Sequence, residues 1–392
     1  MKKATLLIFL FISLIGFVSA QWFEQTSGIY TGLNSVYFTD ANTGYAVGLN
    51  GKILKTTNGG NSWFQLTSGA TINLNSIYFT DSASGYIAEG SGTIWKTTDG
   101  GNNWTLQINF TSFCPESFYF TDINTGYAVG SGGKIIKTIN SGNNWTTLSS
   151  GTSKYLFSVY FTDDNTGFAV GESGTILKTI DSGINWTVQT SGSSDYLYSV
   201  YFTSADTGYT VGVGGTILKT IDAGNSWTIQ ASGTTKNLFS IFFPESDIGY
   251  AVGSDGTIIK TIDAGNSWIT QSSGIYFWLL SVFFTDANTG YAVGEYGKIL
   301  KTTNGGNWIE DNKNSDNNLE IFPNPANDNV FIELSGYKNT KIEISNIEGQ
   351  LLQSLTLQTS KTQIDINNLP SGIYFVKMKN EKSIATRKII KR

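Results

Sequence analysis

The stretch "DANTGYAVG" stands at residues 40–48 and returns, letter for letter, at residues 286–294. Its central glycine also recurs between these copies, always 41 residues after the previous one, at Gly44, Gly85, Gly126, Gly167, Gly208, Gly249 and Gly290. A tryptophan keeps the same period, at Trp22, Trp63, Trp104, Trp145, Trp186, Trp227 and Trp268, and then follows one residue early at Trp308. The two identical stretches are therefore the first and seventh copies of one repeated unit.

The composition of the chain is that of an all-β protein. Hydrophobic residues make up 40% and aromatic residues 14%, enough for a sizeable core, while 44 glycines suit tight turns between short strands. A period of about 40 to 50 β-rich residues is typical of a β-propeller with one four-stranded blade per repeat. The sequence therefore predicts a seven-bladed β-propeller of 41-residue repeats over residues 21–309.

The two ends of the repeat array predict how the ring closes. "WFEQTSG" at residues 22–28 matches "WFQLTSG" at residues 63–69, a fourth-strand sequence, but it has no blade of its own. We expect residues 22–26 to pair with residues 298–303 as the outer strand of the seventh blade, because an unpaired strand edge is prone to association. The alternative is that residues 308–311 fill this place.

A turn of the Asp-box type precedes each tryptophan, as in "TTDGGNNW" at residues 97–104. Its acceptor position holds Asn58, Asp99, Asn140, Asp181, Asp222, Asp263 and Asn304. A short amide or carboxylate at this position can accept backbone N–H groups, while a glycine such as Gly60 supplies the positive φ. Because three of the seven residues are asparagines, we interpret the set as structural rather than as a ring of metal-binding or catalytic carboxylates.

The first twenty residues have the features of a secretory signal peptide. Lys2 and Lys3 precede an apolar run that ends at Val18, and cleavage is expected after Ala20. The rival interpretation, a membrane anchor, calls for a longer run, and we expect no transmembrane segment in the mature chain. The only cysteine, Cys114, cannot form an internal disulfide, so stability must come from packing.

A second domain follows a polar linker at residues 310–318. Residues 319–392 predict a small immunoglobulin-like β-sandwich and contain ten Lys/Arg against seven Asp/Glu, whereas residues 21–318 contain thirteen against twenty-three. The residues that characterise this domain are Pro323, Asn324, Pro325, Gly349, Pro370, Gly372, Tyr374, Lys388 and Lys391.

With these residues the second domain resembles the C-terminal sorting domain of the type IX secretion system, which is found in the Bacteroidota. The resemblance implies passage through the periplasm, delivery to the outer-membrane surface or the medium, and the type IX secretion machinery as a partner. An immunoglobulin-like adhesion module is the alternative.

The repeats themselves, with "GYAVG" followed by the Asp box, resemble those of the photosystem II assembly and stability factor family. They are more distantly similar to sialidases, sortilin-type receptors and xyloglucan-cleaving hydrolases. The resemblance implies the propeller fold and leaves the function open, because one fold serves many functions.

Missing residue types exclude several function classes. The chain has no histidine, which excludes Ser-His-Asp triads and most zinc sites. Arginine occurs only at Arg387 and Arg392, so the propeller has neither the arginine cluster of a sialidase nor a basic patch for nucleic acid. We expect no metal, no cofactor and no nucleic-acid partner.

Candidate ligand-binding residues lie in the loops that vary between repeats. The aromatic candidates precede the inner strands and are Tyr30, Phe113, Tyr155, Tyr196, Tyr276, Phe277 and Trp278. The acidic candidates are Glu116, Glu172, Asp195, Asp255 and Glu295. Both loop sets are expected on the face opposite the Asp boxes, where aromatic rings suit the stacking of sugars or the gripping of peptides. Alternatively, about half of the rings cap the core.

These residues favour a non-catalytic binding or scaffold protein, secreted or displayed at the cell surface and monomeric, that recognises glycan or protein ligands. The alternative is an extracellular polysaccharide hydrolase or lyase, because two carboxylates suffice for glycoside hydrolysis.

Overall fold

The computed structural model describes residues 22–306, 319–334, 340–346, 350–379 and 384–392. The chain divides into two compact units, residues 1–306 and 307–392, which are taken separately below. The predicted signal peptide, the linker, Trp308 and Gly349 lie outside the described residues. In the segments that the structure describes, no helix is long and apolar enough to cross a membrane.

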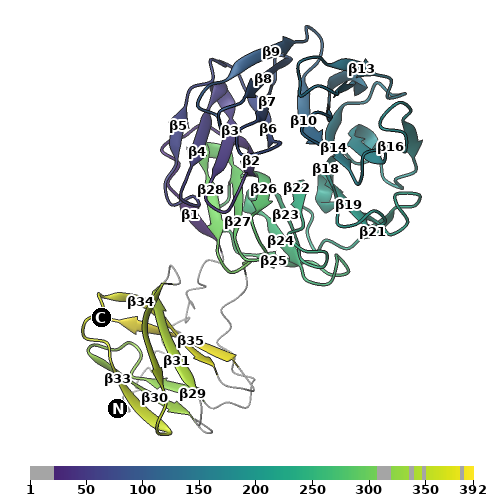
Figure 1. The fold of residues 1–392 in the computed structure, drawn as a ribbon. Coiled ribbons are helices and arrows are strands. Elements are labelled where there is room, and N and C mark those ends of the chain that lie inside the picture. Colours follow the sequence, from purple (N-terminus) through teal and green to yellow (C-terminus); the bar gives the residue numbers. More distant parts are fainter. Residues whose placement is uncertain (1–21, 307–318, 335–339, 347–349, 380–383) are drawn as a thin grey trace, which may run out of the picture. The chain divides into compact units, whose positions relative to one another are not determined.

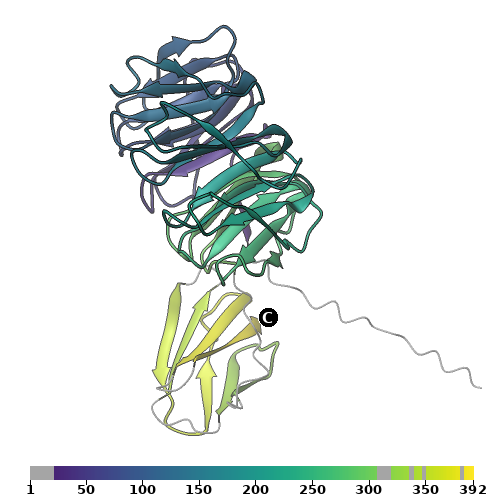
Figure 2. The same ribbon diagram turned by 90° about the vertical axis from the view of Figure 1, so that its right-hand side faces the viewer.

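The first unit is a ring of seven four-stranded antiparallel sheets, as the repeat period predicts (Figures 1 and 2). The inner strands are β2 (Leu33–Phe38), β6 (Leu74–Phe79), β10 (Pro115–Phe120), β14 (Leu156–Phe161), β18 (Leu197–Phe202), β22 (Leu238–Phe242) and β26 (Leu279–Phe284). The second strands are β3 (Gly44–Gly48), β7 (Gly85–Glu89), β11 (Gly126–Gly130), β15 (Gly167–Gly171), β19 (Gly208–Gly212), β23 (Gly249–Gly253) and β27 (Gly290–Gly294).

The third and fourth strands complete each sheet towards the rim. The third strands are β4 (Ile53–Thr56), β8 (Thr93–Thr97), β12 (Ile135–Thr138), β16 (Ile176–Thr179), β20 (Ile217–Thr220), β24 (Ile258–Thr261) and β28 (Ile299–Thr302). The outer strands are β5 (Phe64–Leu66), β9 (Thr105–Asn109), β13 (Thr146–Leu148), β17 (Thr187–Gln189), β21 (Thr228–Gln230), β25 (Ile269–Gln271) and, for the seventh blade, β1 (Phe23–Gln25).

The inner strands form the centre of the ring. Each contacts its two neighbours, and β26 contacts β2. In β2 the first, fourth and sixth residues (Leu33, Val36 and Phe38) are buried. The fifth residues of the seven strands form a closed circle of neighbouring rings with centroids 4.8–6.2 Å apart: Tyr37, Tyr78, Tyr119, Tyr160, Tyr201, Phe242 and Phe283. Aromatic side chains thus form a closed circle at the centre of the ring.

The recurring glycine of "TGY" is required by close packing. A Cβ on Gly44 would lie 2.4 Å from the ring of Phe38, which pairs with it across the sheet. The same phenylalanine clash would occur in the other blades, for example at Gly290 against Phe284. A glycine in a strand allows such close approach, so the repeat keeps it in every copy.

The Asp-box turns are structural, as predicted. Asp99 Oδ1 accepts a hydrogen bond from the backbone N–H of Asn103 (2.9 Å), and Asn58 Oδ1 accepts the equivalent bond from Ser62 (3.0 Å). Gly60 has a φ of +79°. Hydrogen bonds from Asn103, side chain first, lower the pKa of Asp99 to about 2. An amide therefore serves as well as a carboxylate, which explains the mixed composition of this position.

The predicted ring closure is confirmed. Strand β1 pairs antiparallel with β28, with Glu24 opposite Leu300. Trp22, only 1% exposed, packs edge-on against Tyr250 (6.2 Å) and Phe284 (5.8 Å). The N-terminal segment thus supplies both an outer strand and a core tryptophan to the last blade.

The second unit is a β-sandwich of two antiparallel sheets that share one core. One sheet contains β29 (Leu319–Phe322), β30 (Asn329–Leu334) and β33 (Lys361–Asp365). The other contains β32 (Leu351–Thr356), β31 (Lys341–Asn346), β34 (Gly372–Lys379) and β35 (Ile384–Lys391).

Two residues that characterise the second domain, Asn324 and Tyr374, stabilise the sandwich through hydrogen bonds. Asn324 Nδ2 donates to the carbonyl of Lys388 (2.7 Å), and Asn324 Oδ1 accepts from the backbone N–H of Ile390 (2.9 Å). Tyr374 Oη donates to the carbonyl of Pro370 (2.7 Å). The segment around Pro323 and Pro325 is therefore held against β35 by the asparagine between them.

Candidate ligand-binding site at the channel mouth

Two sets of loops meet on one face of the propeller, here called the lead-in face. The lead-in loops enter the inner strands, and 3-10 turns follow six of the second strands: η1 (Leu49–Gly51), η2 (Ser131–Gly133), η3 (Glu172–Gly174), η4 (Val213–Gly215), η5 (Ser254–Gly256) and η6 (Glu295–Gly297). The first N–H of each turn donates to the carbonyl before the inner strand, as from Val213 to Tyr196 (3.0 Å). Because the strands alternate in direction, the Asp boxes lie on the other face.

Two of the predicted acids brace these loops. Glu172 Oε2 accepts the backbone N–H of Tyr155, and Glu295 Oε2 accepts that of Trp278, both at 3.0 Å. Ser131 Oγ fills the same role in the third blade (2.7 Å). A serine can replace the glutamate, so this position serves the loop conformation.

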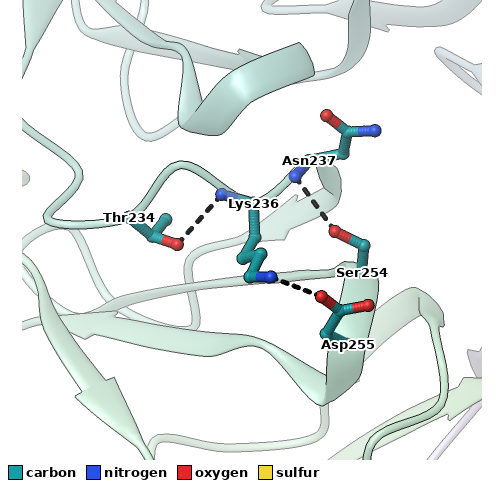
Figure 3. A network of polar contacts seen from close by, with 5 residues as sticks. All are labelled: Thr234, Lys236, Asn237, Ser254 and Asp255. Atoms are coloured by element: carbon teal, nitrogen blue, oxygen red, sulfur yellow. Dashed lines mark hydrogen bonds and ion pairs between the residues drawn. The ribbon is translucent and has the colours of Figure 1, made fainter.

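The next two acids also have partners within the loops. Asp195 Oδ2 accepts hydrogen bonds from Thr216 Oγ1 (2.8 Å) and Ser193 Oγ (3.2 Å). Figure 3 shows Asp255 paired with Lys236, whose Nζ lies 2.5 Å from the carboxylate. Both members of that ion pair are about half exposed, so the pair adds little stability.

The predicted aromatic residues differ in accessibility. Tyr30 and Tyr276 project into solvent, 91% and 89% exposed. Phe277 is partly exposed. The expectation that Phe113 presents its ring to a ligand is wrong: it is 3% exposed and packs edge-on against Phe110 (5.5 Å). This ring belongs to the core between the second and third blades.

Each inner strand has a β-bulge at its second residue, next to the lead-in face. In β14, Leu156 pairs with Gly171 and Ser158 with Val170, which leaves Phe157 without a paired partner. A bulge re-aims its side chain and often lies beside a functional site. The bulges lie at the start of the inner strands, around the centre of the ring on the lead-in face, and this position is called the channel mouth. The seven bulge residues are Asn34, Asn75, Glu116, Phe157, Tyr198, Phe239 and Leu280.

One side of this mouth is aromatic. The aromatic arc consists of Tyr155, Phe157, Tyr196, Tyr198, Phe239 and Trp278. Successive ring centroids lie 5.0 Å apart from Tyr155 to Phe157, 5.2 Å to Tyr198, 5.3 Å to Phe239 and 5.3 Å to Trp278. Tyr196 and Trp278 are 41% and 43% exposed. The arc therefore joins four blades in one partly accessible apolar surface.

The other side of the mouth is polar. Glu116 Oε1 accepts hydrogen bonds from Tyr155 Oη (2.5 Å), Asn75 Nδ2 (3.2 Å) and the Cys114 thiol (3.5 Å). Burial raises the pKa of Glu116, although the bond from Tyr155 opposes this change. Burial likewise raises the pKa of Cys114. The structure thus holds one carboxyl group, surrounded by neutral donors, at the end of the aromatic arc.

Metal-ligating groups and surface depressions give no further candidate site in the described part of the propeller. No group of three or more His, Cys, Asp or Glu side chains among the described residues could hold a metal ion. Two shallow depressions lie on the rim, beside residues 132–134 and 148–153 and beside residues 214–216 and 229–235. They occupy equivalent positions in two blades, so they follow from the repeat.

The sequence pattern identified only half of the arc. Tyr155, Tyr196 and Trp278 were candidates, but Phe157, Tyr198 and Phe239 were not. A signal was present: the second residue of the inner strand changes from copy to copy, while the serine after it recurs from Ser35 to Ser281. That serine bridges neighbouring strands, as Ser281 Oγ does by accepting the backbone N–H of Val36 (3.2 Å). A position that differs between repeats, next to one that does not, is less constrained by the fold and can therefore acquire a binding role.

Comparison with known families gives two matches. Residues 320–392 match the secretion system C-terminal sorting domain. Residues 16–105, 137–232 and 192–272 match the photosynthesis system II assembly factor YCF48, and together these segments span more than half of the chain. The sorting domain marks proteins that type IX secretion delivers to the cell surface or the extracellular space, so the chain is exported by this route.

Solved structures show the same propeller fold. A structure of YCF48 bound to a D1 peptide has 18% identity and a TM-score of 0.63, over 73% of this chain and 99% of that one. YCF48 from Cyanidioschyzon merolae has 19% identity and a TM-score of 0.63, over 72% and 98%. The C-terminal WD40 domain of Sif2 has 13% identity and a TM-score of 0.53, over 69% and 81%. At these identities the likeness shows the fold alone. No curated protein matches the chain.

Proposed function

The chain belongs to the photosynthesis system II assembly factor YCF48 family, and we propose that this exported member is a non-catalytic binding or scaffold protein. It recognises a glycan or protein ligand through the channel mouth on its lead-in face. The sorting domain delivers the propeller to the cell surface or beyond it, where such a ligand is met.

The aromatic arc is the observation that carries this proposal. It is confined to the fourth to seventh blades, although the repeats are otherwise nearly alike. Partly exposed aromatic rings offer a large contact area at little cost in conformational entropy. Rings that the fold itself required would recur in every blade. Their restriction to one side of one face therefore favours a role in ligand contact.

A double substitution tests the site. Tyr196→Ala combined with Trp278→Ala removes the two most exposed rings of the arc, and we expect binding to immobilised glycan and peptide arrays to be lost. Thermal unfolding followed by circular dichroism should change little, because both side chains are about two-fifths exposed. Phe64→Ala removes a 46% exposed ring from the outer strand β5, away from the lead-in loops; it is the matched control and should bind as the unaltered protein does. Equal binding by the double variant would refute the proposal.

A polysaccharide hydrolase or lyase is the second candidate, favoured by the raised pKa of Glu116, since a general acid needs such a shift. Glycoside hydrolysis also requires a second carboxylate. Glu172, Asp195 and Glu295 are engaged in loop hydrogen bonds, which weakens this candidate. Release of reducing sugar from plant or algal polysaccharides by the full chain, lost in Glu116→Gln, would support it against the binding function.

A further inference from the structure

We propose that the channel mouth binds a neutral saccharide chain, whose sugar rings stack on the aromatic arc while a sugar hydroxyl donates a hydrogen bond to Glu116 Oε2. This inference rests on the proposed binding function and names its ligand class. It assigns to Glu116 and to the bulge residues Phe157, Tyr198 and Phe239 a role that their repeat positions alone do not require.

The hydrogen bonds at Glu116 leave one acceptor for a ligand. Tyr155, Asn75 and Cys114 all donate to Oε1. Within the described part of the chain no donor reaches Oε2, and this oxygen is not among the buried polar atoms that lack a partner. At least part of the surface of this oxygen is therefore accessible, although the side chain as a whole is only partly exposed. An ionised carboxylate can accept about four hydrogen bonds, so the oriented group retains unused capacity.

The same tyrosine joins this acceptor to the stacking surface. The Tyr155 hydroxyl holds Glu116, and the Tyr155 ring stacks on Phe157 with centroids 5.0 Å apart and an interplanar angle of 23°. From Phe157 the arc continues through Tyr198 and Phe239. A ligand that reaches Glu116 therefore contacts aromatic rings as well. Sugars combine an apolar ring face with hydroxyl donors, which is the combination that this surface offers.

The charges around the mouth argue against anionic ligands. On the lead-in face, Lys236 is paired with Asp255, and Lys154 Nζ donates to Ser173 Oγ (3.4 Å). The propeller contains no arginine. The donors to Glu116 are all neutral, so a carboxylate ligand placed at this residue meets another carboxyl group and no cation.

A basic peptide is the remaining rival, since cations bind both carboxylates and aromatic faces. Glu116 is a single carboxyl group held by neutral donors, so it gives such a peptide one ion pair at most. A sugar hydroxyl needs no charge on Glu116, because a carboxyl oxygen accepts a hydrogen bond in either protonation state. The surroundings of Glu116 therefore favour the saccharide.

Titration calorimetry with defined oligomers tests the inference on the full mature chain. The probes are cellohexaose, xylohexaose and mannohexaose, with hexagalacturonate as the anionic probe and hexalysine as the basic one. We expect at least one neutral hexasaccharide to bind and the two charged probes to bind at least tenfold more weakly. Failure of all three neutral probes, or preference for either charged probe, overturns the saccharide assignment.

Two variants and a matched control locate the contact. Glu116→Gln should weaken binding of the neutral probe about tenfold, because the amide oxygen takes the three donors of Oε1 and an NH2 group, which accepts no hydrogen bond, replaces the Oε2 acceptor. Phe239→Ala should also weaken it, and circular dichroism verifies that both variants are folded. Asp206→Asn makes the matching change of an acid to an amide at an exposed residue between β18 and β19, on the opposite face, and should bind unchanged. Full affinity in both Glu116→Gln and Phe239→Ala contradicts the proposed contacts.

The result is distinguishable from failure of the binding function itself. If no saccharide binds but a peptide on the array does, and Tyr196→Ala with Trp278→Ala abolishes that binding, the binding function stands and the saccharide assignment fails. If the double variant retains every interaction of the unaltered protein, the binding function fails as well.

Discussion

At most blade junctions one backbone carbonyl oxygen of an Asp-box turn accepts hydrogen bonds from a tyrosine and a lysine side chain of the preceding blade. Gly100 O accepts from Tyr45 Oη (2.8 Å) and Lys55 Nζ (2.7 Å), and the ammonium lies 5.3 Å from the centre of the tyrosine ring. The last junction closes in the same way, where Tyr291 and Lys301 donate to Gly59 O. These lysines are structural, which leaves few cations on the propeller to attract ligands.

The tyrosine hydroxyl at this junction makes a testable contribution. We expect Tyr45→Phe to lower the free energy of unfolding by about 0.5–1.5 kcal/mol, the usual net value of one hydrogen bond. Tyr86 is the matched control: it is buried at the equivalent position, but its hydroxyl finds no partner among the described residues. Tyr86→Phe should be neutral or stabilising, as the natural Phe168 at this position suggests. Urea denaturation measures both, and an equal loss would contradict the explanation.

Among the elements, the short strand β1 closes the ring of blades. It is a three-residue edge strand, yet it joins the beginning of the propeller to the end and covers the third strand of the seventh blade. Trp22 beside it occupies the place that the Asp-box tryptophans occupy in the other core clusters, next to a tyrosine and a phenylalanine. Ring closure therefore depends on an apolar anchor more than on the three backbone pairs.

Two substitutions next to each other separate the anchor from the pairing. We expect Trp22→Ala to lower the free energy of unfolding by about 3–5 kcal/mol, because it leaves a cavity in the last core cluster. Phe23→Ala, which removes a 39% exposed ring from the paired strand, should change it by about 0.5 kcal/mol or less. Guanidinium denaturation measures the free energy of unfolding of both variants. Similar decreases in the two would show that strand pairing, and not Trp22, stabilises the closed ring.

At the scale of the whole molecule the chain contains two units with separate cores. The core of the sandwich is made of residues between Ala326 and Ile389. Each core cluster of the propeller draws on adjacent blades, as where Leu33 and Val36 pack with Tyr291 and Val293. The core of the propeller is therefore shared between neighbouring blades, and among the described residues its clusters and that of the sorting domain are separate.

Removal of residues 319–392 should separate folding from export. We expect the truncated protein to keep the circular dichroism spectrum and melting temperature of the propeller, because all propeller core clusters remain. In its natural host it should accumulate in the periplasm, because the type IX signal is lost. Immunoblots of periplasmic and surface fractions measure this, with the full chain as control. Surface display of the truncated protein would contradict the export route.

The repeat in the sequence was by itself sufficient to determine the number of blades, the role of the Asp boxes and the closing strand. These features depend on local patterns that recur every 41 residues. Examples are the close packing of the Phe38 ring on Gly44 and the hydrogen bond from a backbone N–H of the turn to Asp99. A local pattern of this kind adopts the same structure in each blade, so its recurrence along the chain supports the prediction several times.

The candidate site, in contrast, was decided by the tertiary structure. Glu116, Tyr155 and Phe239 come from three different blades, and only the closed ring and the bulges bring their side chains to one mouth. The sequence also could not show that Phe113 is buried or that Glu172 braces a loop. Whether a loop side chain faces solvent depends on the packing of neighbouring blades, which the pattern within one repeat does not contain.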